Sequence, residues 1–230
     1  MLSAVPLLLL LALTKATSPG PATWEPERAP AEDEAPTSAP TLAEIRARLA
    51  EAPRLDKEAT LGPISLRGFH WAQEIALGTR WRAVVVSCQL GGGIIVFDAA
   101  GRLAGSWRTW EIQSLQLMDV DEDGTTELVT DQKDGVGTGL AKWNYHVYRM
   151  TAAGLRQIWQ GESYFYAVDA RGAVKERQGF LRFVPSGFGD PDAKLVHLVG
   201  PVGSGRFVQS VYVFKDGTFK KRKTIYVARP

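Results

Sequence analysis

Cysteine is almost absent from this chain, since Cys88 is the only one among 230 residues. A single thiol excludes an intramolecular disulfide and leaves no basis for a cysteine-built zinc site. Cys88 lies two residues after a run of three valines, in a segment that is typical of a β-strand. We therefore expect a buried and inert thiol, not a nucleophile.

Histidine is also scarce, and none of the three histidines stands in a recognisable catalytic or metal-binding motif. His70, His146 and His197 are isolated, with no H-E-x-x-H pair, and Gly203-Ser204-Gly205 lacks the G-x-S-x-G spacing of a nucleophile elbow. The sequence therefore favours a protein that is not an enzyme. The alternative is a secreted hydrolase with an unrecognised active site, which would need a cleft that gathers a histidine with acidic residues.

Long hydrophobic runs are missing as well. The apolar run at 6–13 is far shorter than the roughly 20 residues of a membrane-spanning helix, so no stable membrane span is expected. Small residues at Thr14 and Ala16 follow it, and no cysteine that could carry a lipid does. Residues 1–16 are typical of a signal peptide cleaved after Ala16, which predicts a secreted or periplasmic protein.

The segments that follow differ sharply in composition. Residues 17–40 hold six prolines and the acidic cluster Glu32-Asp33-Glu34, and we expect a disordered Pro/Ala-rich linker. Residues 41–60 predict one short helix and a connection, with Thr41 and Glu44 at capping-box spacing. Residues 61–230 predict the folded domain.

That domain has the pattern of an all-β protein. Segments 82–88 and 94–98 are rich in β-branched residues, and we expect Gly91-Gly92-Gly93 to lie in a hairpin loop between them. Strand–glycine–strand units recur at 96–107, 147–159 and 211–222, with a weaker one at 165–175. Their spacing suggests one four-stranded antiparallel sheet per unit. About three units are too few to close a propeller, which leaves a partial propeller, an open stack of sheets or a small barrel.

The strongest motif lies at 119–128, which reads D-V-D-E-D-G-T-T-E-L. Three alternating aspartates, Asp119, Asp121 and Asp123, precede a glycine, and Glu127 follows. Ca²⁺ prefers six to eight oxygen ligands, and carboxylates gathered on a tight turn would repel one another without a cation. An EF-hand is excluded because its twelfth position, which requires Glu, is Thr130. The alternative is an Asp-Gly turn with solvated acids.

The flanking β-strand patterns and this spacing resemble the calcium loop of the FG-GAP/VCBS repeats found in integrin-type β-propeller blades. The resemblance covers some ten residues. It implies Ca²⁺ as the cofactor, with side-chain oxygens from Asp119, Asp121, Asp123 and Glu127, and the backbone carbonyl of Thr125 as a further ligand.

The charge of the whole chain is nearly balanced, with 27 Lys and Arg against 25 Asp and Glu. The run Lys220-Lys-Arg-Lys223 is best explained as a lysine-protected edge strand, with an anionic surface as the alternative. No nucleic-acid motif is present. Among the aromatic residues, Trp107, Trp110 and Trp143 are candidates for a sugar-stacking platform, although packing accounts for most such side chains.

Together these features predict an exported β-sheet module with a binding or adhesion role toward a glycan or protein surface, in which calcium is structural. A purely structural domain without a metal is the third hypothesis.

Overall fold

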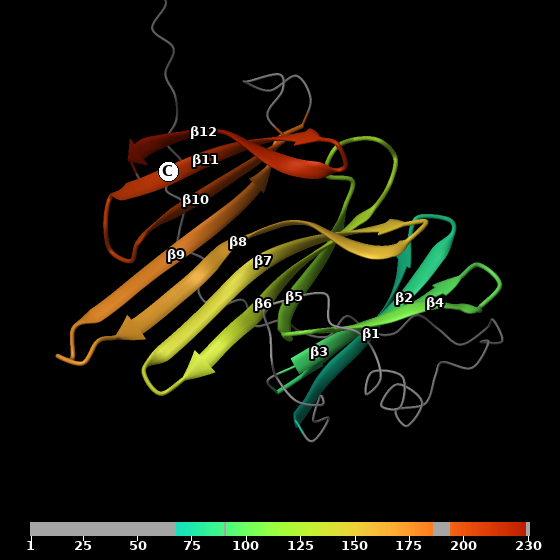
Figure 1. Cartoon of the computed structure of the whole chain (residues 1–230), viewed down its shortest axis with the longest axis horizontal. Helices are drawn as coiled ribbons and strands as arrows, with labels where there is room; N and C mark the ends of the chain where they lie inside the picture. The colour runs from blue at the N-terminus through green and yellow to red at the C-terminus, as the bar shows by residue number, and fades with distance from the viewer. Residues whose placement is uncertain (1–67, 90, 186–193, 229–230) are drawn as a thin grey trace, which may run out of the picture. The chain divides into compact units, whose positions relative to one another are not determined.

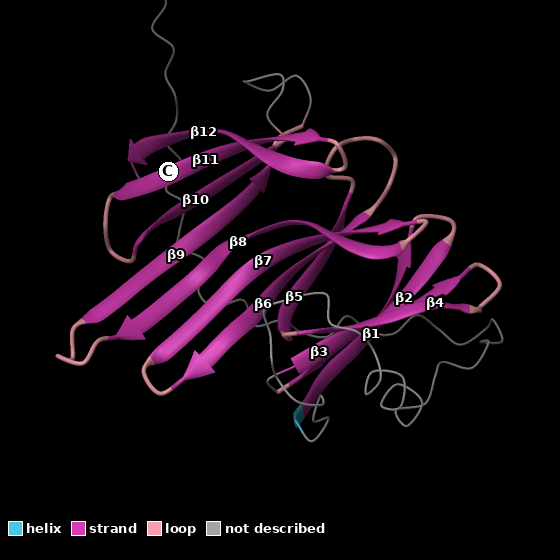
Figure 2. Cartoon of the chain, viewed as in Figure 1, coloured by secondary structure: helices cyan, strands magenta, loops and turns pink. Residues whose placement is uncertain are grey.

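The structure is a computed structural model that describes residues 68–89, 91–185 and 194–228. Within these residues the chain is built almost entirely from antiparallel strands (Figures 1 and 2), which confirms the all-β prediction. The strands are β1 (Phe69–Leu77), β2 (Trp81–Cys88), β3 (Gly91–Asp98), β4 (Leu103–Thr109), β5 (Glu111–Met118), β6 (Glu127–Gly137), β7 (Leu140–Thr151), β8 (Gly154–Val168), β9 (Val174–Phe183), β10 (Leu195–Pro201), β11 (Arg206–Lys215) and β12 (Thr218–Ala228).

The three N-terminal segments assigned from the sequence lie outside the described residues. These are the signal peptide at 1–16, the linker at 17–40 and the helix and connection at 41–60, and the assignments stay predictions. In the part of the chain that the structure describes, no helix has the length and apolarity needed to cross a membrane.

The strands form two sheets. The first is four-stranded in the order β1-β2-β3-β4, and the second is eight-stranded in the order β12-β11-β10-β9-β8-β7-β6-β5. The expectation of one four-stranded sheet per repeat therefore holds for β1–β4 but is wrong for the rest of the described chain. The physical reason is that β8, which spans 15 residues, pairs with β7 on one side and with β9 on the other. It therefore joins the strands before and after it into one sheet.

The strands of the second sheet continue without a gap from β5 to β12, and these two strands are its edges in the described residues. The second sheet is therefore open. Among the predicted arrangements, an open stack of antiparallel sheets matches the structure, and the propeller-blade character of these sheets stays a prediction.

The predicted hairpins are present. The turns at Gly101, Gly154, Gly172 and Gly217 all have positive φ and join β3 to β4, β7 to β8, β8 to β9 and β11 to β12. This backbone conformation favours glycine because it has no Cβ.

The glycine run at 91–93 is not the expected hairpin loop. Gly91, Gly92 and Gly93 are strand residues of β3 that pair with Cys88, Ser87 and Val86. A Cβ on Gly92 would lie 2.7 Å from Thr109 Oγ1 and 2.8 Å from the carbonyl oxygen of Val86. Glycine is needed there because neighbouring chain segments approach the strand closely.

The valine-rich strand β2 is buried on both faces, and Cys88 within it has no exposed surface, as predicted. One face of β2 contributes Ala83 and Val85 to the main core, and the other packs Val84 and Val86 against Ile95.

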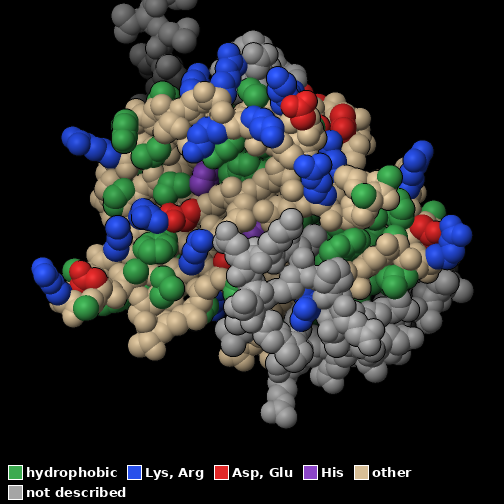
Figure 3. Space-filling view, in the orientation of Figure 1, with side chains coloured by type: hydrophobic (Ala, Val, Ile, Leu, Met, Phe, Trp, Pro, Cys, Tyr) green, Lys and Arg blue, Asp and Glu red, His purple; other side chains and the backbone are tan. Residues whose placement is uncertain are grey.

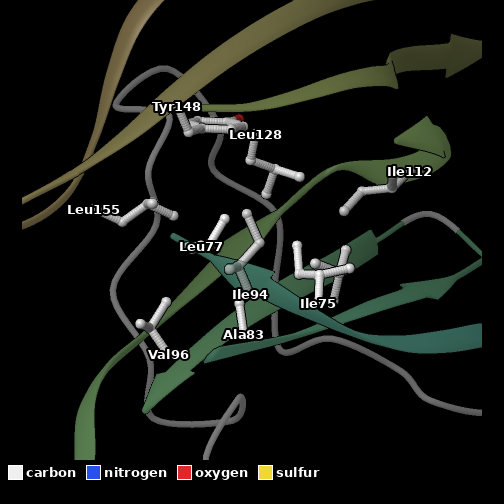
Figure 4. Close-up of a cluster of buried hydrophobic side chains, with 10 residues drawn as sticks. Ile75, Leu77, Ala83, Ile94, Val96, Ile112, Leu128, Tyr148 and Leu155 are labelled. Atoms are coloured by element: carbon white, nitrogen blue, oxygen red, sulfur yellow. The ribbon is translucent and has the colours of Figure 1, made fainter. Parts of the chain in front are cut away.

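The main core joins the two sheets (Figure 4). Ile75, Leu77, Ile94 and others from the first sheet meet side chains from β5–β8, namely Ile112, Leu128, Tyr148 and Leu155. A second cluster lies on the second sheet and includes Val129, Val147, Trp159, Leu195 and Phe219. Alternation along β6 thus directs Leu128 toward one cluster and Val129 toward the other, which fixes the direction of Glu127 at the start of the strand.

Candidate functional site

The acidic motif forms a loop between two paired strands, as predicted. β5 ends at Met118 and β6 begins at Glu127, and these two residues are register partners. Two loop residues have positive φ, Glu122 at 62° and Gly124 at 84°. The chain therefore turns sharply at the positions where the motif needs a tight curl.

Aspartate side chains fold the loop by accepting backbone hydrogen bonds. The amides of Asp123 and Gly124 donate to Asp119 at 3.1 and 2.8 Å, and the amide of Thr125 donates to Asp123 Oδ1 at 2.8 Å. Partial burial acts in the opposite sense, but the Thr125 amide and the nearby Arg149 guanidinium hold the pKa of Asp123 below its ordinary value. These contacts thus favour the ionised form of Asp123.

Glu127 is fully buried, although it is a carboxylic acid. Burial raises its pKa to about 7, against the effects of the Val120 amide, which donates to Oε2 at 2.9 Å, and of Arg149. A buried carboxylate needs a compensating charge. The side chain that supplies it is Arg149 on β7, whose Nε lies 2.6 Å from Glu127 Oε1.

Arg149 binds three of the four acidic residues of the motif. Besides Glu127, its guanidinium contacts Asp121 at 2.6 Å and Asp123 at 3.2 Å, and it lies 4.7 Å from the ring centroid of Phe214. Sequence reasoning missed this residue. The signal that points to it is the hairpin β6–β7, in which Leu128 pairs with Tyr148, so that Glu127 and Arg149 are adjacent.

Three of the predicted ligands come together as a group that could hold a metal ion. One carboxylate oxygen each from Asp119, Asp121 and Glu127 lies within 4.8 Å of the others. Asp123 is not in this group, and its side chain is 44% exposed. Thr125 lies in the same loop, and its predicted role as a carbonyl ligand stays a prediction. The three aspartates outnumber the single guanidinium of Arg149, which leaves negative charge for a cation to neutralise.

A second polar cluster surrounds His146, which the sequence suggested was isolated. Its Nε2 lies 3.0 Å from Asp134 Oδ2 and its Nδ1 lies 3.0 Å from Gln157 Oε1. Asn144 also donates to Asp134. His146 has no exposed surface, and both ring nitrogens have protein partners. This arrangement is that of a satisfied buried histidine, and the hydrolase alternative stays a prediction.

Asp131 lies near this cluster and accepts a hydrogen bond from Ser163. Burial is the largest influence on this carboxyl and raises its pKa to about 6, while Ser163 and His146 act in the opposite direction.

The candidate tryptophans take part in packing. Trp107 is partly buried against the main core, and its ring lies beside Gly154. The ring centroid of Trp143 lies 5.2 Å from that of Tyr164. The structure therefore gives these two side chains packing roles, and a sugar platform built on them or on Trp110 stays a prediction.

No family model matches the chain, and neither the curated proteins nor the solved structures contain a match.

Proposed function

We propose that this chain is an exported β-sheet binding module whose β5–β6 loop binds calcium in a structural role, in the manner of an FG-GAP/VCBS loop. The observation that carries the proposal is the convergence of Asp119, Asp121 and Glu127 within 4.8 Å on a tight turn. The D-x-D-x-D-G spacing and oxygen-only ligands are typical of a hard cation such as Ca²⁺.

Arg149 is part of this proposal because it already neutralises some of the charge. Calcium would share or displace the guanidinium at Asp121, where the ion pair is 2.6 Å long, and this competition lowers the net gain from binding. A dissociation constant on the order of 10⁻⁴–10⁻³ M, the range of extracellular modules, is expected. The ion would join the end of β5 to the start of β6 and stiffen that edge of the second sheet.

The binding role is supported by side chains that the strands leave exposed. Val174 is 59% exposed and Tyr226 is 86% exposed, both on the second sheet. Residues of this kind are available for a partner surface, and the calcium loop would hold the sheet that presents them.

A thermal melt with calcium and with chelator tests the proposal. A ligand that binds only the folded state stabilises it, by about 1.4 kcal/mol at 1 mM calcium for a dissociation constant of about 0.1 mM. For a domain of this size that corresponds to a rise of about 3–6 °C in Tm. Asp121→Ala should abolish the rise. Asp169→Ala, in the β8–β9 turn, is the matched control and should keep it. An unchanged parent Tm would refute the proposal.

A further inference from the structure

Positive charge is concentrated in the C-terminal strands. Described residues 174–185 and 194–228, which contain β9–β12, hold ten Lys and Arg against two acidic residues, Glu176 and Asp216. The described residues before them, 68–89 and 91–173, hold nine against twelve. In Figure 3 many blue side chains lie over the upper part of the view, where β10–β12 run. The two parts of the chain therefore have opposite charge.

The centre of this basic region is β12, the edge strand of the second sheet. Lys220, Lys221, Arg222 and Lys223 are consecutive and all exposed. Lys221 lies 5.9 Å from the ring centroid of Tyr212, and alternation directs Lys220 to the opposite face. The basic side chains thus extend to both faces of the strand.

Protection against edge-to-edge pairing does not account for this number of charges. A bulge already interrupts the β11–β12 ladder, because Val211 pairs with Lys223 and Tyr212 with Lys221, which leaves Arg222 as the extra residue. A bulge and charged side chains on the edge strand itself are the devices that block edge pairing. Nine basic side chains on β9, β11 and β12, with Lys194 just before β10, exceed that need, and eight of these ten are exposed.

We propose that β12 and its neighbouring strands form a binding surface for a linear anionic polysaccharide. A flexible linear chain can follow the 11-residue strand, which is about 36 Å long at 3.3 Å per residue, and reach basic groups on both faces. A flat lipid surface would meet only one face. Single-stranded nucleic acid is usually held on several aromatic side chains, whereas β12 offers one strongly exposed aromatic, Tyr226.

Tyr226 adds a contact that charge alone does not provide. It lies three residues after Lys223 on the same strand and is 86% exposed. Its ring can pack against the apolar face of a sugar. The surface therefore combines a basic run with an adjacent aromatic group.

Binding of the full chain to heparin, used as the linear sulfated probe, tests this proposal. The measurement is made in chelator, so that its outcome does not depend on the calcium site. The parent should bind heparin with an affinity that falls as salt is raised, and it should not bind uncharged dextran. Failure to bind heparin at low salt would overturn the proposal.

Matched variants locate the surface. The variant with Gln at positions 220–223, which combines Lys220→Gln, Lys221→Gln, Arg222→Gln and Lys223→Gln, should bind heparin about tenfold more weakly. The control changes four exposed basic residues outside β9–β12 to Gln, namely Arg80, Lys142, Arg156 and Arg171. Its affinity for heparin should fall about twofold or less. Equal losses in the two variants would mean non-specific charge attraction and would overturn the assignment to β12.

Two further probes separate the polysaccharide from other polyanions. A single-stranded DNA oligonucleotide and phosphatidylglycerol vesicles are compared with heparin at the same salt concentration. Weaker binding to both supports the proposal. Equal or tighter binding to either would overturn it in favour of that partner.

Discussion

The β5–β6 loop and the β9–β12 strands both concentrate charge of one sign, but they treat it differently. In the loop, the carboxylates are packed together, and an internal cation, Arg149, binds Asp121, Asp123 and Glu127. In the C-terminal strands, basic side chains outnumber acidic ones ten to two, and most are exposed to solvent. The loop carboxylates form ion pairs within the protein, whereas most basic side chains of the C-terminal strands face solvent.

The difference follows from burial at one residue, Glu127, which has no exposed surface and pairs with Arg149, whereas Asp119 and Asp123 are exposed. Removing one partner of a buried ion pair leaves an uncompensated charge, which is strongly destabilising. An exposed charge is screened by water and salt and contributes little to stability. Mutations that break the buried ion pair of the loop should therefore lower the stability of the protein. Mutations in the basic strands should instead weaken binding to a partner.

Arg149→Met is the variant expected to have the largest effect on stability. It leaves Glu127, which has no exposed surface, without the guanidinium that compensates its charge, although the Val120 amide still donates to Oε2. The free energy of unfolding in chelator should fall by about 3–5 kcal/mol, measured by urea denaturation at pH 7.5. Calcium should restore part of the loss, because a dication can replace the guanidinium.

Arg156→Met is the matched control for that experiment. Arg156 is exposed and pairs with Arg149 across the β7–β8 hairpin. Its removal should change the free energy of unfolding by about 0.5 kcal/mol or less. Equal losses in the two variants would contradict a structural role for Arg149.

Asp131→Asn should have an intermediate effect that depends on pH. Burial raises the pKa of Asp131 from 3.8 to about 6, so the folded state favours the protonated carboxyl. Its contribution to stability is present below pH 3.8 and is lost as pH rises through 6. The asparagine can still accept the hydrogen bond from Ser163 but does not titrate. Relative to this variant, the free energy of unfolding of the parent should fall by about 3 kcal/mol between pH 3.5 and pH 7. Urea denaturation at the two pH values measures this difference. Parallel pH profiles would contradict the assignment.

The smallest effect on stability is expected from the variant with Gln at positions 220–223. Each of the four side chains is exposed, and surface substitutions usually change stability by about 0.5 kcal/mol or less. The Tm of this variant should stay close to that of the parent while heparin binding falls. A large loss of stability would mean that the basic run has a structural role, as the charges of the loop do.

Much of the β structure could be predicted from local sequence. The β-branched segments at 82–88 and 94–98 are strands, and the glycine turns close the expected hairpins. The position of Gly92 could not be predicted. A glycine run is typical of a loop, and the need for glycine arises from Thr109 and other groups that are distant in sequence.

The candidate site was predictable only in part, because Arg149 enters it through strand register. Gly137 pairs with Leu140 next to the turn, and counting back from that pair places Arg149 opposite Leu128. A bulge between Gln132 and Gly135 shifts the ladder by one residue, so that Tyr148 takes that position and Arg149 lies beside Glu127. The local motif shows the acidic residues, but not the internal cation that a bulge brings to them.

Calorimetric titration of calcium into the full chain tests the central claim most directly. The parent should show one saturable site with a dissociation constant on the order of 10⁻⁴–10⁻³ M, Asp121→Ala should show none, and Arg149→Met should bind more tightly because a competing cation is gone. The absence of saturable heat from the parent would contradict the claim and would leave the loop as an acidic turn that Arg149 closes.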